Sequence, residues 1–271
     1  MDGDALYTNA QYIVRVAQGP EELRQVFELR YRVFHKELGE SATTSDEQEK
    51  DAYDEFCHHL IVVCKNTKNI IATERLLPWF YLDHKKGYYS ETEFELVNLP
   101  KDNILECGRL CIERKYRDSV SLLSLWLGLY QYCVQYKVRY LFGCTSLRKN
   151  TSDEVVLQIY HYLKSNGLIT EKYHARAKVP LANLNNTHPT VLSDSEFSAV
   201  VPKLVKNYIR VGASFIGSPS YDPEFSVYDL LTIWEVGAPK VRWIARFIAL
   251  KTFVLSQIKR LKHNLAAPIE K

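Results

Sequence analysis

The sequence lacks the features that would indicate a membrane span, a disulfide framework or a metal site. No stretch of about 18 uncharged apolar residues occurs, so we expect no membrane-spanning helix. The first eleven residues are polar and acidic, unlike a secretory signal peptide. The six cysteines form no C-x-x-C pair, and His58-His59 has no partner at a metal-ligand spacing. We therefore expect reduced core thiols in a cytoplasmic protein without a bound metal.

The composition otherwise suits one large α/β domain with a sizeable core. Of the 271 residues, 46% are hydrophobic and 12% aromatic. The net charge of +3 is unevenly spread, because residues 238–271 hold eight bases and one acid, whereas residues 1–237 hold 27 bases and 31 acids. A mildly acidic body with a basic tail suggests a surface-directed tail and no binding of nucleic acid.

The order of elements predicts a mixed central sheet flanked by helices. We expect residues 1–10 to be disordered, 11–237 to form the α/β domain and 238–271 to form a basic amphipathic helix and tail. In the domain, the patterns predict strands at 12–17, 59–65, 70–77, 104–112, 138–144, 213–216 and 228–236, and helices at 20–38, 120–134, 152–164 and 202–211. Residues 39–50 are a candidate mobile lid, 173–200 are expected to be irregular, and 217–222 to be a turn.

The last predicted helix, residues 239–264, carries apolar residues at steps of three and four. Trp243, Phe247 and Leu250 begin this stripe, and bases cover the remaining surface. Such a helix is typical of a segment that lies on an anionic membrane. The alternative is a helix that packs on the domain and leaves its basic face in water.

One apolar strand carries two charged residues that are costly to bury. In residues 104–112, Glu106 shares a face with Ile104, Gly108, Leu110 and Ile112, and Arg109 lies on the other face. The pair could be a buried ion pair that fixes the register, or part of an active site. The basic turn at 114–117 and the apolar helix after it favour a site that receives an anionic ligand arm.

Several short motifs are informative in combination: residues 29–34 (LRYRVF), Glu49-x-Asp51-x-Tyr53-Asp54, Arg75 and Glu106-x-x-Arg109. These motifs resemble those of the N-acyl-homoserine lactone synthases, which are acyltransferases with the GNAT fold. The aromatic residue expected before the acidic segment is absent, which counts against a lactone product. The sequence is more similar to the acyl-carrier-protein-dependent N-acyltransferases that make lyso-ornithine lipid. The matching motifs include Asp54-x-x-Cys57-x-His59-Leu60, Glu91-x-Glu93-Phe94, Glu106-x-Gly108-Arg109-x-Cys111, Tyr208-x-Arg210-x-Gly212 and Asp222-x-x-Phe225-x-x-x-Asp229.

This resemblance implies transfer of a long, 3-hydroxylated acyl chain to the α-amine of an amino acid, with ornithine favoured. N-acyl derivatives of glycine or tyrosine, a homoserine lactone product, and a non-catalytic lipid-binding role remain alternatives. Glu106 is the candidate base, and Arg109 would orient it or meet the substrate. The expected substrate-binding residues are Arg30, Phe34, Asp51, Asp54, His59 and Arg75. Arg30 and Arg75 suit a carboxylate, and Asp51 and Asp54 a cationic side chain.

The turn after the central strand bears on the acyl donor. Relatives that use acetyl-CoA place glycines there to hold a pyrophosphate, whereas residues 117–121 read RDSVS and include Asp118. We expect no resident cofactor, and acyl carrier protein bearing a phosphopantetheine thioester as donor substrate. The expected docking bases for this acidic partner are Arg114, Lys115, Arg117, Arg148 and Lys149. The other expected partners are the amino acid and the inner face of the cytoplasmic membrane.

Overall fold

The structure is a computed structural model that describes residues 4–37, 39, 46–82, 86–182, 184, 191–236, 250 and 254. It divides into two compact units. The first unit comprises residues 1–76, 108–138 and 242–271, and the second comprises residues 77–107 and 139–241. Strand β6 (Ile104–Ile112) runs through both units, with Cys107 the last residue in the second unit and Gly108 the first in the first unit. The units are described separately.

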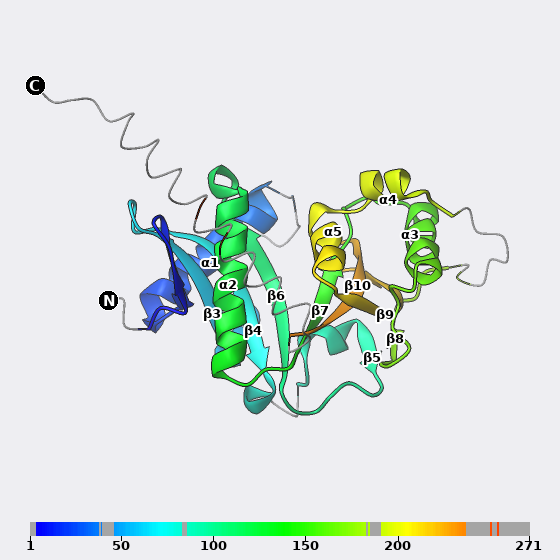
Figure 1. The fold of residues 1–271 in the computed structure, drawn as a ribbon, viewed down its shortest axis with the longest axis horizontal. Coiled ribbons are helices and arrows are strands. Elements are labelled where there is room, and N and C mark those ends of the chain that lie inside the picture. Colours follow the sequence, from blue (N-terminus) through cyan, green and yellow to red (C-terminus); the bar gives the residue numbers. More distant parts are fainter. Residues whose placement is uncertain are drawn as a thin grey trace, which may run out of the picture. The chain divides into compact units, whose positions relative to one another are not determined.

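The first unit is a sheet with one helix on each face (Figure 1). Strands β1 (Tyr7–Thr8), β2 (Tyr12–Val16), β3 (His58–Cys64) and β4 (Ile70–Pro78) pair in sequence order, followed by β6. Alternate residues of β3 face opposite sides, as a strand requires. Ile61 and Val63 pack in a cluster with residues of α1 (Gly19–Tyr31). On the other face, α2 (Ser119–Gln135) packs on β2 and β3.

One glycine sets how closely α2 approaches the sheet. A Cβ atom at Gly128 would lie 2.2 Å from the Cγ1 atom of Val14, which is fully buried in β2. Any larger residue at this position would push the helix from the strand, so the apolar helix predicted from the sequence depends on this glycine for its packing.

The second unit combines the first part of β6 with β7 (Tyr140–Ser146), β10 (Val227–Glu235) and β9 (Ser214–Asp222). β6 is parallel to β7, and the ladder pairs residues Ile104 to Glu106 with Tyr140 to Phe142. The other two pairings are antiparallel, so the sheet is mixed as predicted. Helices α3 (Asp153–Ser165), α4 (Asp194–Val200) and α5 (Lys203–Arg210) share one core with β9 and β10. Strands β5 (Phe94–Leu96) and β8 (Ala175–Ala177) form a separate two-stranded sheet.

Most predicted elements are confirmed, and three predictions are wrong. Residues 7–8 form a strand rather than a disordered segment, because they pair with Ile13 and Val14 of β2. Residues 217–222, expected to be a turn, continue β9 because their backbone pairs with β10. Residues 173–200, expected to be irregular, include β8 and α4.

Helix α1 ends earlier than predicted and continues as a π-helical turn, Arg32–Glu37. Half of the candidate lid, residues 40–45, and all of the predicted C-terminal amphipathic helix except Leu250 and Val254 lie outside the described residues. Within the ranges that the structure describes, no helix is both long and apolar enough to span a bilayer.

Candidate functional site

Six charged side chains of the first unit form a closed ring of alternating sign. In order around the ring they are Arg30, Asp54, Arg75, Asp51, Arg109 and Glu49. The three arginines come from α1, β4 and β6, and the three acids come from the segment before β3. The ring therefore fastens residues 49–54 to three separate elements with its formal charges in balance, and it contains five of the eight predicted catalytic and substrate-binding residues.

The Arg30 side chain, which belongs to α1, is fully buried. Its Nη1 atom lies 2.8 Å from Asp54 and 3.7 Å from Glu49. Its Nη2 atom lies 3.0 Å from Nδ1 of His59. A guanidinium group only donates hydrogen bonds, so Nδ1 of His59 must accept. The Nε2 atom then carries the proton and faces the backbone oxygen of Asp54 at 3.3 Å.

These contacts set the charge states of Asp54 and His59. Burial alone would raise the pKa of Asp54, but the charges of Arg30 and Arg75 outweigh it and hold the pKa at about 2. Burial, assisted by the charge of Arg30, lowers the pKa of His59 to about 4. His59 is therefore neutral at physiological pH, and it does not add a fourth positive charge to the ring.

The other two arginines divide the acids between them. Arg75 lies 2.7 Å from Asp51 and 3.4 Å from Asp54. Arg109 lies 2.8 Å from Glu49 and 3.2 Å from Asp51. Both Asp51 and Asp54 are thus held by cations of the chain itself. Their predicted role as binders of a substrate cation stays a prediction.

Arg109 adopts an unusual backbone conformation for a residue inside a strand. Its φ of 53° lies in the left-handed region, which costs an L-residue about 1–2 kcal/mol. A left-handed residue of this kind is typical of a β-bulge, and it interrupts the strict alternation of faces predicted for the strand. Strained residues persist where their surroundings hold them in place, and they cluster at functional sites. Here Glu49 and Asp51 hold the Arg109 side chain.

In the second unit, Glu106 lies at the end of the β6–β7 ladder and is buried. Its carboxylate accepts hydrogen bonds from the backbone N–H of Tyr89 at 2.8 Å and of Ser90 at 2.6 Å. The Ser90 hydroxyl donates a third bond, also of 2.6 Å. These donors begin the short helix Tyr89–Thr92, and they fix the orientation of the carboxylate. No pattern in the sequence indicates that Tyr89 and Ser90 are its partners.

The thiols of Cys111 and Cys144 are poorly suited to act as nucleophiles. Burial raises the pKa of Cys111 to about 12 and that of Cys144 well above its usual value. The reactive form of cysteine is the thiolate, so both groups stay protonated and inert at neutral pH. Cys144 instead lies 3.5 Å from the Ser90 hydroxyl, to which its thiol donates.

The remaining predicted residues occupy different places. Phe34 lies in the π-helical turn and packs, partly buried, against the core cluster around α1. Arg114, Lys115 and Arg117 are exposed in or next to the short helix Arg114–Tyr116 of the first unit. Arg117 is bound to Glu37, with Nη2 and Oε2 2.9 Å apart. The last two bases, Arg148 and Lys149, are exposed in the second unit.

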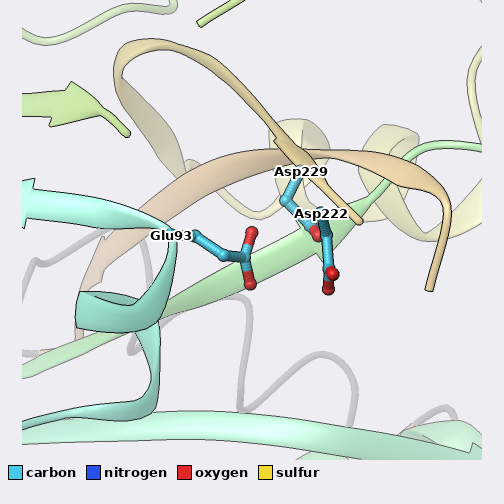
Figure 2. A group of neighbouring side chains, drawn as sticks. All are labelled: Glu93, Asp222 and Asp229. Atoms are coloured by element: carbon cyan, nitrogen blue, oxygen red, sulfur yellow. The ribbon is translucent and has the colours of Figure 1, made fainter. Parts of the chain in front are cut away.

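Three buried acids without an assigned role meet in the second unit, namely Glu93, Asp222 and Asp229 (Figure 2). Each offers one carboxylate oxygen, and these oxygens all lie within 4.8 Å of one another. These acids belong to the motifs Glu91-x-Glu93-Phe94 and Asp222-x-x-Phe225-x-x-x-Asp229. Because the two motifs are far apart along the chain, the sequence did not indicate that the three acids form one cluster.

Comparisons with known proteins agree with this architecture. An acetyltransferase (GNAT) domain matches residues 29–127. The chain is similar to an L-ornithine N(alpha)-acyltransferase of Brucella abortus, with 26% identity over 86% of this chain and 88% of the relative. It is similar to an L-ornithine N(alpha)-acyltransferase of Agrobacterium fabrum, with 27% identity over 86% of this chain and 84% of the relative. Among solved structures, it is similar to a CoA-dependent acyl-homoserine lactone synthase with SAM and isopentyl-CoA. The identity there is 14%, the TM-score 0.52, and the match covers 84% of this chain and 82% of the other. The predicted α/β fold of the GNAT type is confirmed.

Proposed function

We propose that this acyltransferase with the GNAT fold moves a long fatty acyl chain from a thioester to the α-amine of an amino acid, with ornithine as the acceptor. Two L-ornithine N(alpha)-acyltransferases align with more than four-fifths of the chain, which supports the acceptor. The observation that carries the chemistry is the fixed, buried carboxylate of Glu106, beside the point where the β6–β7 ladder ends. Transfer of a 3-hydroxylated chain rests on the sequence resemblance alone.

The reaction is aminolysis of a thioester, and it needs a neutral amine. Glu106 accepts a proton from the substrate ammonium, directly or through water. The amine nitrogen then attacks the thioester carbonyl carbon, the C–N bond forms, and the C–S bond breaks. The thiolate leaves and takes up a proton, so the products are an amide and a free thiol. Direct attack by the amine is favoured because Cys111 and Cys144 both stay protonated at neutral pH.

The negative charge that develops on the thioester oxygen needs donors. We assign this role to backbone N–H groups beyond the last β6–β7 pair, Glu106 with Phe142. Gly143 follows this pair, and a Cβ atom there would lie 2.2 Å from the carbonyl oxygen of Cys107. A glycine at this position lets the two backbones approach each other closely without a side chain between them. The substrate-binding roles predicted for Arg30, Arg75 and His59, and the catalytic role predicted for Arg109, stay predictions.

Acyl carrier protein is the proposed donor, and Asp118 supports this choice. Its carboxylate caps α2 by accepting hydrogen bonds from the backbone N–H groups of Val120 and Ser121, each at 2.9 Å. These are the helix-start amides that would otherwise receive a pyrophosphate. A phosphopantetheine arm on a carrier protein carries one phosphate and does not need such a cradle. The exposed bases Arg114, Lys115 and Arg117 of the first unit would attract the acidic carrier, and so would Arg148 and Lys149 of the second unit.

The donor proposal is tested by kinetics with acyl carrier protein and acyl-CoA of the same chain length. We expect the KM for the carrier to rise steeply with salt, because exposed charges are screened within about 8 Å at physiological ionic strength. Arg114→Glu should raise this KM, whereas Lys164→Glu, on an exposed part of α3, should leave it unchanged. A KM that is flat with salt, or equal in both variants, would remove this docking surface from the proposal.

Membrane association through residues 238–271 belongs to the same proposal, because a long-chain amide product partitions into a bilayer. Eight bases against one acid in this segment favour anionic lipid on the cytoplasmic side. Deletion of residues 239–271 should release the protein from anionic liposomes. Unchanged association would contradict the role of the segment.

The acceptor is tested by expressing the protein in a bacterial host, extracting lipids and measuring the mass of new amine-containing products. We expect an N-acylated ornithine. N-acyl glycine, N-acyl tyrosine or an acyl-homoserine lactone would identify one of the alternative synthases. Tight lipid binding without transfer to any amine would favour the non-catalytic role.

A further inference from the structure

The second unit contains three buried carboxylates that the proposed chemistry does not use. We name Glu93, Asp222 and Asp229 the acidic cradle; their exposed fractions are 6%, 5% and 2%. Asp222 ends β9, Asp229 lies in β10, and Glu93 follows the short helix that Glu106 holds at its start. Figure 2 shows the Glu93 carboxylate pointing towards the two aspartates.

One oxygen of the cradle is left without a partner. The Glu93 Oε2 atom is buried and, among the described residues, accepts no hydrogen bond. No base of the described part of the chain forms an ion pair with Glu93, in contrast to the balanced ring around Arg30. Burial, and then the charges of Asp229 and Asp222, raise the pKa of Glu93 to about 9. A buried acceptor facing two further acids is costly unless a cation or a proton neutralises it.

The cradle is connected to Glu106 through side chains of the same unit. The Ser90 hydroxyl donates to Glu106 at 2.6 Å, and the Cys144 thiol donates to the Ser90 hydroxyl at 3.5 Å. The Cys144 thiol also interacts with Glu93. The backbone completes the link, because Glu93 N–H donates to the carbonyl of Ser90 at 3.2 Å. The proposed base and the acidic cradle therefore belong to one continuous cluster.

We propose that the acidic cradle binds the side-chain ammonium of the acceptor amino acid and so selects ornithine over acceptors with uncharged side chains. This inference rests on the proposed function. A primary ammonium has three N–H donors, and the cradle offers one carboxyl oxygen from each of three residues. The bound cation would take the place of the proton that Glu93 otherwise carries. Hydrogen bonds between charged partners are stronger than neutral ones, and a site built for a charged group rejects an analogue that lacks it. The substrate α-amine would then lie on the Glu106 side of the cluster.

The test is a competition between ornithine and norvaline, which has the same carbon chain without the side-chain amine. Equal concentrations of both react with one acyl donor, and mass spectrometry gives the ratio of the two amides. This ratio equals the ratio of the two kcat/KM values, so a general loss of activity cancels. Wild-type protein should favour ornithine, and Asp229→Asn and Glu93→Gln should each lower the ratio by about tenfold or more, the effect of losing one charged hydrogen bond.

Glu95→Gln is the matched control, since Glu95 is an exposed acid two residues from Glu93 that faces Arg176 at 3.5 Å. It should keep the wild-type ratio. Thermal unfolding identifies any variant that does not fold, and two isosteric variants keep the test decisive. A ratio within twofold of wild type in both folded variants would refute the cradle.

A divalent metal is the competing occupant, because three carboxylates also suit a hard cation. Loss of activity toward both acceptors in EDTA, with recovery on adding Mg²⁺ or Mn²⁺, would overturn the inference in favour of a metal. Absence of both amides with wild-type protein would refute the proposed function itself, and the inference about the cradle would fail with it.

Discussion

Replacing Glu106 by glutamine separates a catalytic role for this carboxylate from a purely structural one. Glutamine keeps the shape but turns one of the two oxygens into an NH₂ group. The oxygen bound to the Ser90 N–H and hydroxyl has two donors, and the oxygen bound to the Tyr89 N–H has one. We therefore expect the NH₂ group to face Tyr89, where two donors then oppose each other.

The structural cost of this change follows from the bonds lost. One hydrogen bond to a charged acceptor disappears and the other two lose their charge, so the free energy of unfolding should fall by about 2–4 kcal/mol. Ser90→Ala is the matched control, because it removes one donor and leaves the carboxylate. It should lower the free energy of unfolding by about 1–2 kcal/mol. Urea unfolding measures both values.

The catalytic effect should be much larger than the stability effect. Loss of a general base costs about two to four orders of magnitude in turnover. We expect kcat/KM of folded Glu106→Gln to fall in this range, with single-turnover acyl transfer as the assay, while Ser90→Ala loses less than about tenfold. The remaining activity of Glu106→Gln should rise with pH, since the amine must then lose its proton to solvent. A folded Glu106→Gln variant within threefold of wild type would refute the assignment of the base.

Three further predictions concern the ring, His59 and the donor. Asp54→Ala should lower the free energy of unfolding by about 3–5 kcal/mol, because it leaves two buried arginines without their full counter-charge. The control Asp46→Ala breaks the exposed pair with Lys50 and should cost less than about 1 kcal/mol. Equal losses in urea unfolding would contradict the stabilising role of the ring. His59 has an unfolded pKa of 6.5 and a folded pKa of about 4. Its contribution to the free energy of unfolding is therefore complete above pH 6.5 and falls by about 3 kcal/mol as the pH drops through 4. A His59→Asn variant with the same acid dependence would show that another group causes the loss of stability in acid. Asp118→Ala should cost about 0.5–2 kcal/mol of stability, because it removes the cap of α2. It should also increase the use of acyl-CoA relative to acyl carrier protein, because it releases two backbone amides that can bind a pyrophosphate. An unchanged donor ratio would refute the proposal that Asp118 disfavours acyl-CoA.

The sequence was sufficient for elements whose own pattern dictates them. The strand predicted at 104–112 has those bounds in the structure, and the helix predicted at 120–134 is longer by one residue at each end. The helix predicted at 152–164 and the strands predicted at 59–65 and 70–77 are also present, within one residue of those bounds. The strand at Tyr7–Thr8 and the full length of β9 were missed because pairing with a neighbouring strand overrides their polar or turn-like composition.

The candidate site was predictable only where residues fall in one motif. Glu106, Arg109, Asp51 and Asp54 were found in short motifs. The ring that joins Arg109 to the two aspartates depends on four elements meeting in space. The acidic cradle was missed for the same reason, since Glu93 and the two aspartates lie far apart in the chain. Glu49 was visible in the motif, but only the structure shows that it closes the ring.

Incubation of the purified protein with a long-chain acyl-carrier-protein thioester and ornithine is the decisive test of the proposed acyl transfer. Free thiol and acylated ornithine are measured over time, and tandem mass spectrometry locates the acyl group on the α- or δ-nitrogen. We predict one Nα-acyl-ornithine for each thiol released. Thiol release without any amide, or acylation at the δ-nitrogen, would contradict the proposed function.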